Sequence, residues 1–208
     1  MLFDNQYPLS AYKEITPLCE KGHVVLVQNE RDGNFYVKKH IPCYNPEIYP
    51  LLQKNPVKNT PAIYGIYEED SAANEFETNL ILIEEYIPGS TLAELLEERG
   101  TFSEKETIHI AMQVCRILMD LHAMKPSVIH RDIKPSNIML SSDGTVKLLD
   151  FNAAKTENSN KNRDTVLLGT AGFAAPEQYG FFSSSPQTDI YSVGVLINIL
   201  LNGKLPAE

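Results

Sequence analysis

Four polar residues have the types and spacing of a catalytic centre. Asp132, Lys134 and Asn137 lie in one short segment, and Asp150 follows an apolar run further along the chain. An aspartate can accept a proton, and a lysine can balance negative charge. Aspartate and asparagine oxygens are ligands that Mg²⁺ prefers in proteins. Chemistry on a metal-bound phosphate group requires this combination of a base, a cation and oxygen ligands.

The four residues belong to motifs that occur in a fixed order. These are HRDIKPSN at 130–137, DFN at 150–152 and APE at 175–177. Over nearly the whole chain the sequence resembles bacterial-type Ser/Thr protein kinases. The resemblance implies a two-lobed α+β fold. Residues 1–84 would form a mainly antiparallel β lobe, and residues 85–208 a hinge and a mostly helical lobe that lacks its last helices.

The resemblance also implies roles for the four residues and two cofactors, ATP and Mg²⁺. Asp132 would act as the base for a substrate hydroxyl, and Lys134 would stabilise charge on the transferring phosphoryl. Asn137 and Asp150 would hold magnesium. A lysine at position 134 is typical of the Ser/Thr-specific type. The implied reaction is therefore transfer of the terminal phosphoryl of ATP to Ser or Thr hydroxyls.

Each of these residues also has an ordinary structural interpretation. Asp132 could be a turn residue, and Asn137 could simply open the strand that follows it. The hairpin pattern after them favours the site, because Asp143 and Gly144 form a turn signal and Asp150 ends the next apolar run. The combined pattern therefore favours the catalytic interpretation.

The N-terminal third contains the expected nucleotide-binding strands. Residues 24–27 and 34–39 read as a strand pair joined by a turn. The resemblance places Val37 toward adenine and makes Lys39 the phosphate-holding lysine, because the two share one face of a strand. Lys38 would then face solvent. Glu47, before a short helix over 48–54, is the predicted acidic partner of Lys39.

The turn that covers the nucleotide in the family departs from its usual pattern. The three family glycines would fall on Cys19, Lys21 and Val24, so close backbone approach to the phosphates is weakened. Leu18 and Leu26 flank this turn and complete the expected ATP-binding residues of the first hairpin.

Residues 80–83 are an apolar strand that leads into the expected hinge. There the Glu85 carbonyl and the Ile87 amide would hydrogen-bond adenine. Glu84 falls where the family usually has an apolar or small residue. It either pairs with a cation such as Lys39 or points elsewhere.

The remaining chain predicts three helices with recognisable ends. Thr91 with Glu94 and Ser103 with Glu106 are capping boxes, and Ser185 precedes the third helix. In the second helix the apolar residues at helical spacing are predicted to be core: Ile108, Ala111, Met112, Cys115, Leu118 and Met119.

Three further residues of the large lobe have predicted roles. His122, in the second helix, is expected to be a packing or surface residue. Asp189 matches a family aspartate that braces the catalytic loop. Asn152 replaces a family glycine and tolerates left-handed backbone angles.

The expected activation segment lies between Asp150 and Glu177; residues 153–168 are its polar part, and residues 153–170 are the stretch for possible self-phosphorylation. Self-phosphorylation there, for example at Thr165, would create a charge-assisted contact with Arg131. The alternative is an ordinary solvated loop that contains Thr156, Ser159 and Thr165.

Composition restricts the partners. The net charge of −9 argues against nucleic acid or an anionic membrane, and leaves protein substrates with Ser or Thr. Three cysteines without metal-ligand spacing indicate reduced thiols and a cytoplasmic location. The longest apolar stretch is shorter than a membrane span.

The chain ends soon after the third predicted helix, which leaves two functional readings. An exposed apolar flank is expected, and it fits a fragment, a partner that covers it, or a large lobe of marginal stability. A working kinase is the first reading. The alternative is a kinase-like module that binds a nucleotide or a partner without useful turnover. A small-molecule kinase fits poorly because of the motif at 175–177.

Overall fold

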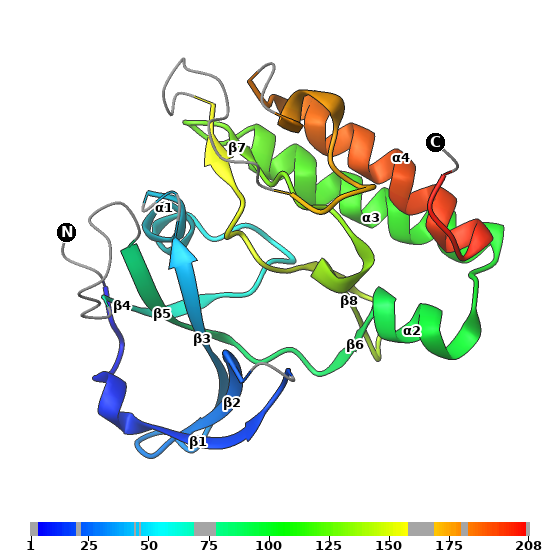
Figure 1. The fold of residues 1–208 in the computed structure, drawn as a ribbon. Coiled ribbons are helices and arrows are strands. Elements are labelled where there is room, and N and C mark those ends of the chain that lie inside the picture. Colours follow the sequence, from blue (N-terminus) through cyan, green and yellow to red (C-terminus); the bar gives the residue numbers. More distant parts are fainter. Residues whose placement is uncertain are drawn as a thin grey trace. The chain divides into compact units, whose positions relative to one another are not determined.

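The computed structural model describes residues 4–19, 22–43, 45, 47–68, 78–157, 169–179 and 183–206. The chain divides into two compact units (Figure 1). Met1–Pro56 and Pro61–Ile87 form the first unit, and Val57–Thr60 and Pro88–Glu208 form the second. The division thus falls three residues beyond the predicted boundary at 84/85, and one short segment from the N-terminal third belongs to the second unit.

The first unit is built on a five-stranded antiparallel sheet with the strand order β1-β2-β3-β5-β4. The strands are β1 (Tyr12–Pro17), β2 (Val24–Asn29), β3 (Phe35–Cys43), β4 (Ile63–Glu68) and β5 (Thr78–Glu85). The three strands that the sequence predicts are central in this sheet. β2 alternates between buried and half-buried residues, as expected of a strand with one face on the core. The edge strands β1 and β4 were not predicted.

One helix and the N-terminal segment complete the first unit. Helix α1 (Ile48–Lys54) is short, as predicted, and packs against β4. Asn5 exchanges two hydrogen bonds with the backbone of Ile66, at 3.0 and 2.7 Å, so the N-terminal segment extends along the β4 edge. The Gln53 side chain of α1 donates to the Asp4 carbonyl at 2.6 Å. The N-terminal segment thus ties α1 to the sheet.

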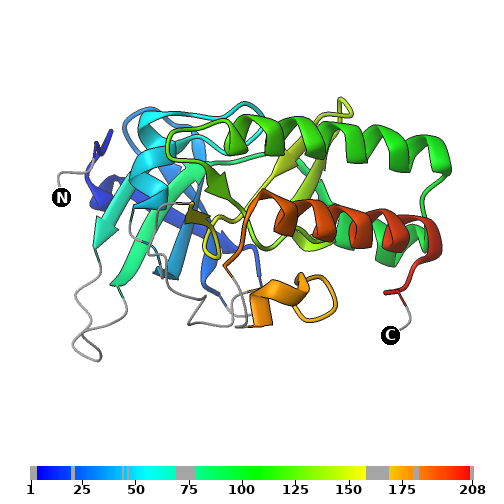
Figure 2. The same ribbon diagram turned by 90° about the horizontal axis from the view of Figure 1, so that it is seen from above.

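The second unit contains three long helices whose predicted caps are present. These are α2 (Leu92–Arg99), α3 (Glu104–His122) and α4 (Pro186–Asn202). Capping boxes begin α2 and α3, at Thr91 and Ser103, and at the start of α4 the Ser185 amide donates to the Thr188 hydroxyl at 3.0 Å. Figures 1 and 2 show α3 and α4 side by side and antiparallel. The Phe102 amide before α3 donates to the Leu200 carbonyl near the end of α4, at 2.7 Å.

The predicted core face of α3 is partly wrong. Ala111 and Leu118 are buried, but Ile108, Met112 and Met119 are 59%, 52% and 69% exposed. The helix buries a neighbouring stripe instead, composed of Thr107, Ile110, Ala111, Val114, Ile117, Leu118 and Leu121. Two apolar stripes overlap on this helix, and periodicity alone does not select the one that packs against α4. None of the helices within the described residues is long and apolar enough to cross a membrane.

Short strands position the loops of the second unit. β6 (Gly89–Thr91), β8 (Ile138–Ser141) and β9 (Val146–Leu148) form one sheet, and β7 (Val128–Ile129) pairs with β10 (Lys155–Thr156). Gly89 is required at its position, because a Cβ there would lie 2.6 Å from the Leu140 carbonyl oxygen. The Leu148 amide donates to the Asn59 carbonyl at 2.9 Å, which attaches the segment Val57–Thr60 to β9.

Candidate active site

The Asp132 carboxylate is the centre of a hydrogen-bonded cluster in the second unit. Its Oδ2 accepts from Asn137 Nδ2 at 2.9 Å and lies 2.8 Å from Lys134 Nζ. Its Oδ1 accepts from the Thr170 hydroxyl at 2.8 Å. A one-turn helix over Pro135–Asn137 brings Asn137 back toward Asp132. The structure thus brings together Asp132, Lys134 and Asn137 as the sequence predicted.

Thr170 is a member of this cluster that none of the sequence motifs indicates. Its hydroxyl accepts from Lys134 Nζ at 2.7 Å and donates to Asp132. Thr170 was grouped with the activation segment and the stretch before the motif at 175–177. No local signal indicated that its side chain would reach residues 36 to 38 positions earlier. A hydroxyl in contact with Asp132 shows that this carboxylate can receive a hydroxyl hydrogen bond.

Asp189 holds the backbone of the loop that carries Asp132. Its fully buried carboxylate accepts from the amides of His130 and Arg131 at 3.0 and 2.7 Å. Arg131 has a φ of 70°, a left-handed conformation that few non-glycine residues adopt. Asp189 therefore stabilises a strained backbone next to Asp132. His122, predicted to be a packing or surface residue, instead bonds Asp189 through Nε2 at 2.8 Å.

Asp150 follows β9 and is fixed by contacts with the catalytic loop. The Leu149 amide donates to the Asn137 carbonyl at 2.8 Å, and His130 Nε2 donates to the Leu149 carbonyl at 3.0 Å. The rings of His130 and Phe151 meet edge to face, with centroids 4.9 Å apart. The left-handed residue of this turn is Asp150, with a φ of 61°, and not Asn152, where the sequence placed the need for it.

Asn137 and Asp150 fit a magnesium site by their donor atoms. Asn137 Nδ2 donates to both the carbonyl and the carboxylate of Asp132, which leaves the amide oxygen Oδ1 for a cation. Asp150 Oδ1 accepts from the Asn152 amide at 3.2 Å, and its Oδ2 supplies a second hard oxygen. Magnesium is commonly held by one or two protein oxygens together with substrate phosphates and water.

Lys39 in the first unit pairs with Glu84 and not with the predicted Glu47. Lys39 Nζ lies 2.5 Å from Glu84 Oε1, and the two side chains are only 12% and 8% exposed. In the β3–β5 register Val37 is opposite Glu84, so Lys39 is its diagonal neighbour on the same face. Glu47 is exposed at the start of α1. The prediction of Glu47 is therefore wrong, and of the two alternatives left open for Glu84 the structure shows the pair with Lys39.

Lys38 also has an acidic partner. Its Nζ lies 2.8 Å from Glu14 Oε1 on β1, so it does not simply face solvent. This pairing lowers the pKa of Glu14, through the hydrogen bond from Lys38 and its charge.

The other predicted nucleotide-binding residues differ in exposure. Val37 and Ile87 are buried, Leu26 is half-buried, and Leu18 is 46% exposed. Glu85 exchanges hydrogen bonds with Ala62, through its amide to the Ala62 carbonyl at 2.8 Å and through its carboxylate from the Ala62 amide at 3.2 Å. Adenine contacts at the Glu85 carbonyl and the Ile87 amide stay predictions.

Parts of two predicted loops lie outside the described residues. These are Lys21 in the nucleotide-covering turn, and Ser159 and Thr165 in the activation segment.

The carboxylate of Glu177 accepts a hydrogen bond from the Thr188 hydroxyl at 2.6 Å. Thr188 on α4 thus gives this carboxylate a partner within the chain.

Comparison with known proteins agrees with this fold and geometry. A family model of the protein kinase domain matches residues 20–208. The chain therefore belongs to the protein kinase family.

Curated relatives are bacterial Ser/Thr kinases. Serine/threonine-protein kinase PknL of Mycobacterium tuberculosis is 36% identical over 149 residues, which cover 71% of this chain and 36% of the relative. Serine/threonine-protein kinase PknB of Mycobacterium leprae is 30% identical over 178 residues, 85% of this chain and 27% of the relative. Probable serine/threonine-protein kinase PknB of Lactococcus lactis is 31% identical over 71% of this chain and 23% of the relative. The chain thus matches only about a third or less of these proteins' length.

Proposed function

We propose that this chain transfers the terminal phosphoryl group of ATP to Ser or Thr hydroxyls of protein substrates. The observation that carries the proposal is the Asp132 carboxylate, which Lys134, Asn137 and the Thr170 hydroxyl contact together. Asp132 orients the substrate hydroxyl and receives its proton, while Lys134 balances negative charge beside it. The names of the relatives support the Ser/Thr class.

Asn137 and Asp150 would hold magnesium in this reaction through the two oxygen atoms described above. Bound magnesium neutralises charge on the phosphates of ATP. Lys39, fixed by Glu84, would contact the phosphates, and Val37, Leu26, Leu18, Glu85 and Ile87 would surround the base and sugar. A cytoplasmic location and self-phosphorylation within residues 153–170 belong to the same proposal.

The test measures transfer of labelled terminal phosphate from Mg-ATP to the chain itself and to a basic peptide that contains Ser and Thr. Asp132→Asn and Asp150→Ala are each expected to lower transfer by about a thousandfold or more. Glu97→Gln, which changes an exposed carboxylate on α2, is the matched control and should keep full transfer. Equal transfer in all variants would show that the activity does not come from this site.

A binding module without turnover is the second candidate. The observation in its favour is the covering turn, where Cys19 and Val24 stand in place of family glycines. Protection by Mg-ATP against thermal unfolding, without transfer from a folded chain, is the outcome that selects it. Transfer abolished by Asp132→Asn rejects it.

A further inference from the structure

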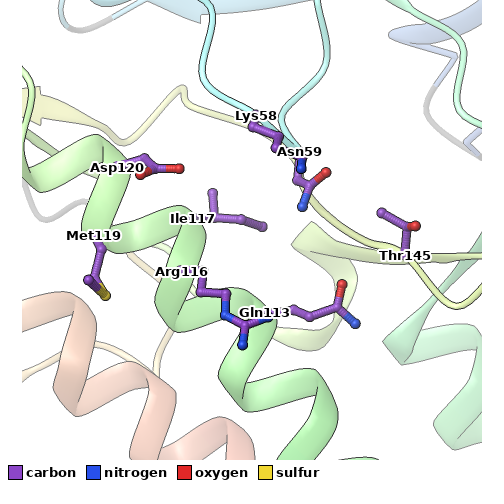
Figure 3. Close-up of a pocket in the computed structure, with 8 residues that line it drawn as sticks. All are labelled: Lys58, Asn59, Gln113, Arg116, Ile117, Met119, Asp120 and Thr145. Carbon is purple, nitrogen blue, oxygen red and sulfur yellow. The ribbon is translucent and has the colours of Figure 1, made fainter.

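A pocket of about 510 Å³ lies in the second unit and contains none of the candidate active-site residues. Three parts of the chain line it: the segment Val57–Thr60, helix α3 and the turn between β8 and β9 (Figure 3). This volume is within the range of ligand-binding pockets. The pocket is therefore large enough to receive two or three side chains of another molecule.

The charged groups at this pocket have no partners within the described part of the chain. Lys58 and Arg116 are exposed, and neither forms a hydrogen bond or an ion pair with a described residue; the same is true of Asp120. Two cations and one carboxylate give the pocket a net positive charge, although the chain as a whole carries −9. A carboxylate or phosphate group is the complementary ligand, because a guanidinium donates to it through two parallel N–H groups.

An apolar wall lies beside these charges. Ile117 is buried and forms part of the pocket wall, and Figure 3 shows it between α3 and the segment that carries Lys58 and Asn59. Met119 is 69% exposed at the pocket. Exposed methionine and arginine side chains are common where proteins bind peptides, because methionine adapts its shape to the partner. A small-molecule site would instead enclose most of its ligand.

We propose that this pocket binds an acidic peptide segment of a partner protein. A Glu or Asp side chain of the peptide would contact Lys58 and Arg116, and a neighbouring apolar side chain would pack on the exposed Met119. Asp120 would accept a hydrogen bond from a peptide amide. Each contact uses a group that the chain itself leaves unpaired or exposed.

Two residues of the pocket also hold β9. The Gln113 side chain accepts from the Val146 amide at 3.0 Å and donates to the Gly144 carbonyl at 3.1 Å. The Asn59 carbonyl accepts from the Leu148 amide. A bound peptide that restricts Asn59 and Gln113 is therefore expected to slow hydrogen exchange at the amides of Val146 and Leu148.

The experiment measures binding without nucleotide, so it is independent of the proposed transfer activity. The probes are fluorescein-labelled 12-residue peptides with one Glu and one Leu, placed one to four positions apart in a Gly/Ser background. Matched peptides carry Gln in place of Glu. The proteins are the native chain, Lys58→Ala, Arg116→Ala and Lys105→Ala. Lys105 is an exposed control lysine on α3 that does not line the pocket.

At least one Glu spacing is expected to bind the native chain and Lys105→Ala equally. Lys58→Ala and Arg116→Ala are each expected to weaken binding by about three- to tenfold, as for single charged contacts. Hydrogen exchange at Val146 and Leu148 should slow only with the Glu peptide.

Several results would overturn the proposal. One is equal binding of the Gln peptides, which means that the charge is not recognised. Another is an equal loss in Lys105→Ala, which indicates a general charge effect. A third is no binding of any peptide to a chain that circular dichroism shows to be folded. If free glutamate or inorganic phosphate competes at the peptide's own concentration, the site takes a small anion and the peptide assignment is wrong.

Discussion

Asp132 in the second unit and Lys39 in the first are charged residues with predicted roles in phosphoryl transfer, and each is held differently within its own unit. Asp132 receives contacts from three side chains, two of them from its own loop. Lys39 has its acidic partner Glu84 on the neighbouring strand of the sheet. The position of the Asp132 carboxylate thus depends on loop geometry, whereas that of the Lys39 side chain depends on strand register. Changes to α1 are therefore expected to affect Lys39 less than changes to β5.

The largest expected effect tests how the loop that carries Asp132 is held. Asp189→Asn replaces a carboxylate oxygen, which accepts from a buried backbone amide, by an NH₂ group that cannot accept. We expect a loss of about 3 kcal/mol in the free energy of unfolding, measured by urea denaturation. Glu97→Gln is the control and should change it by less than about 0.5 kcal/mol. A stable Asp189→Asn variant would mean that the loop is held by other contacts.

The next effect tests the Thr170 contact within the same cluster. Thr170→Val keeps the shape but removes the hydroxyl that links Lys134 to Asp132. Transfer of phosphate should fall by about ten- to a hundredfold, the range of a lost positioning contact at a catalytic base. Thr170→Ser restores the hydroxyl and is expected to retain transfer within about threefold of the native rate. Equal rates for the Ser and Val variants would contradict a role for the hydroxyl.

A smaller effect tests the pair of Lys39 with Glu84 in the sheet. Glu84→Gln removes the negative charge that Glu84 places beside Lys39, so kcat/KM for Mg-ATP should fall by about tenfold as the lysine becomes less well oriented. Glu47→Gln, on the exposed start of α1, should change it by less than about twofold. An increase of kcat/KM in Glu84→Gln would show that the pair holds Lys39 back from the phosphates. A larger effect of Glu47→Gln would restore the helix as the source of the partner.

The smallest effect concerns the pH dependence of the first unit. Burial raises the pKa of Tyr12 to about 12, with a further contribution from Tyr67. The unfolded tyrosine loses its proton near pH 10. Stability from neutral Tyr12 is therefore complete below pH 10 and is lost as the pH rises toward 12. Urea midpoints at pH 9 and 11 should differ less in Tyr12→Phe than in the native chain, and an unchanged difference would contradict the assignment.

Local patterns account for the features that the sequence predicted well. The caps at Thr91 and Ser103 and the turn at Gly144 involve residues only a few positions apart. Such contacts form in the same way in many folds. The motif at 130–137 likewise contains most of the cluster around Asp132. Sequence alone therefore located the residues that surround Asp132 and the long helices.

The missed features depend on residues that are distant in the chain. The sequence left two alternatives for Glu84, and the register between β3 and β5, which residue spacing does not reveal, decides that it pairs with Lys39. Thr170 reaches Asp132 only after the chain has returned from the activation segment. On α3, the exposed Met112 and the buried Val114 are both apolar, and only the packing of the unit distinguishes them.

The segment Val57–Thr60 means that neither unit is one uninterrupted stretch of polypeptide. The backbone leaves the first unit after Pro56, returns at Pro61 and leaves again after Ile87. A protein cut at residue 88 would therefore remove the carbonyl of Asn59, and the Leu148 amide of β9 would lose its acceptor. During synthesis, β9 can use residues that emerged long before it, so its pairing closes a loop of nearly ninety residues. If evolution exchanged the second unit between two proteins, the segment Val57–Thr60 would have to be exchanged with it. Because this segment lies within the sequence of the first unit, the two units are expected to be inherited together.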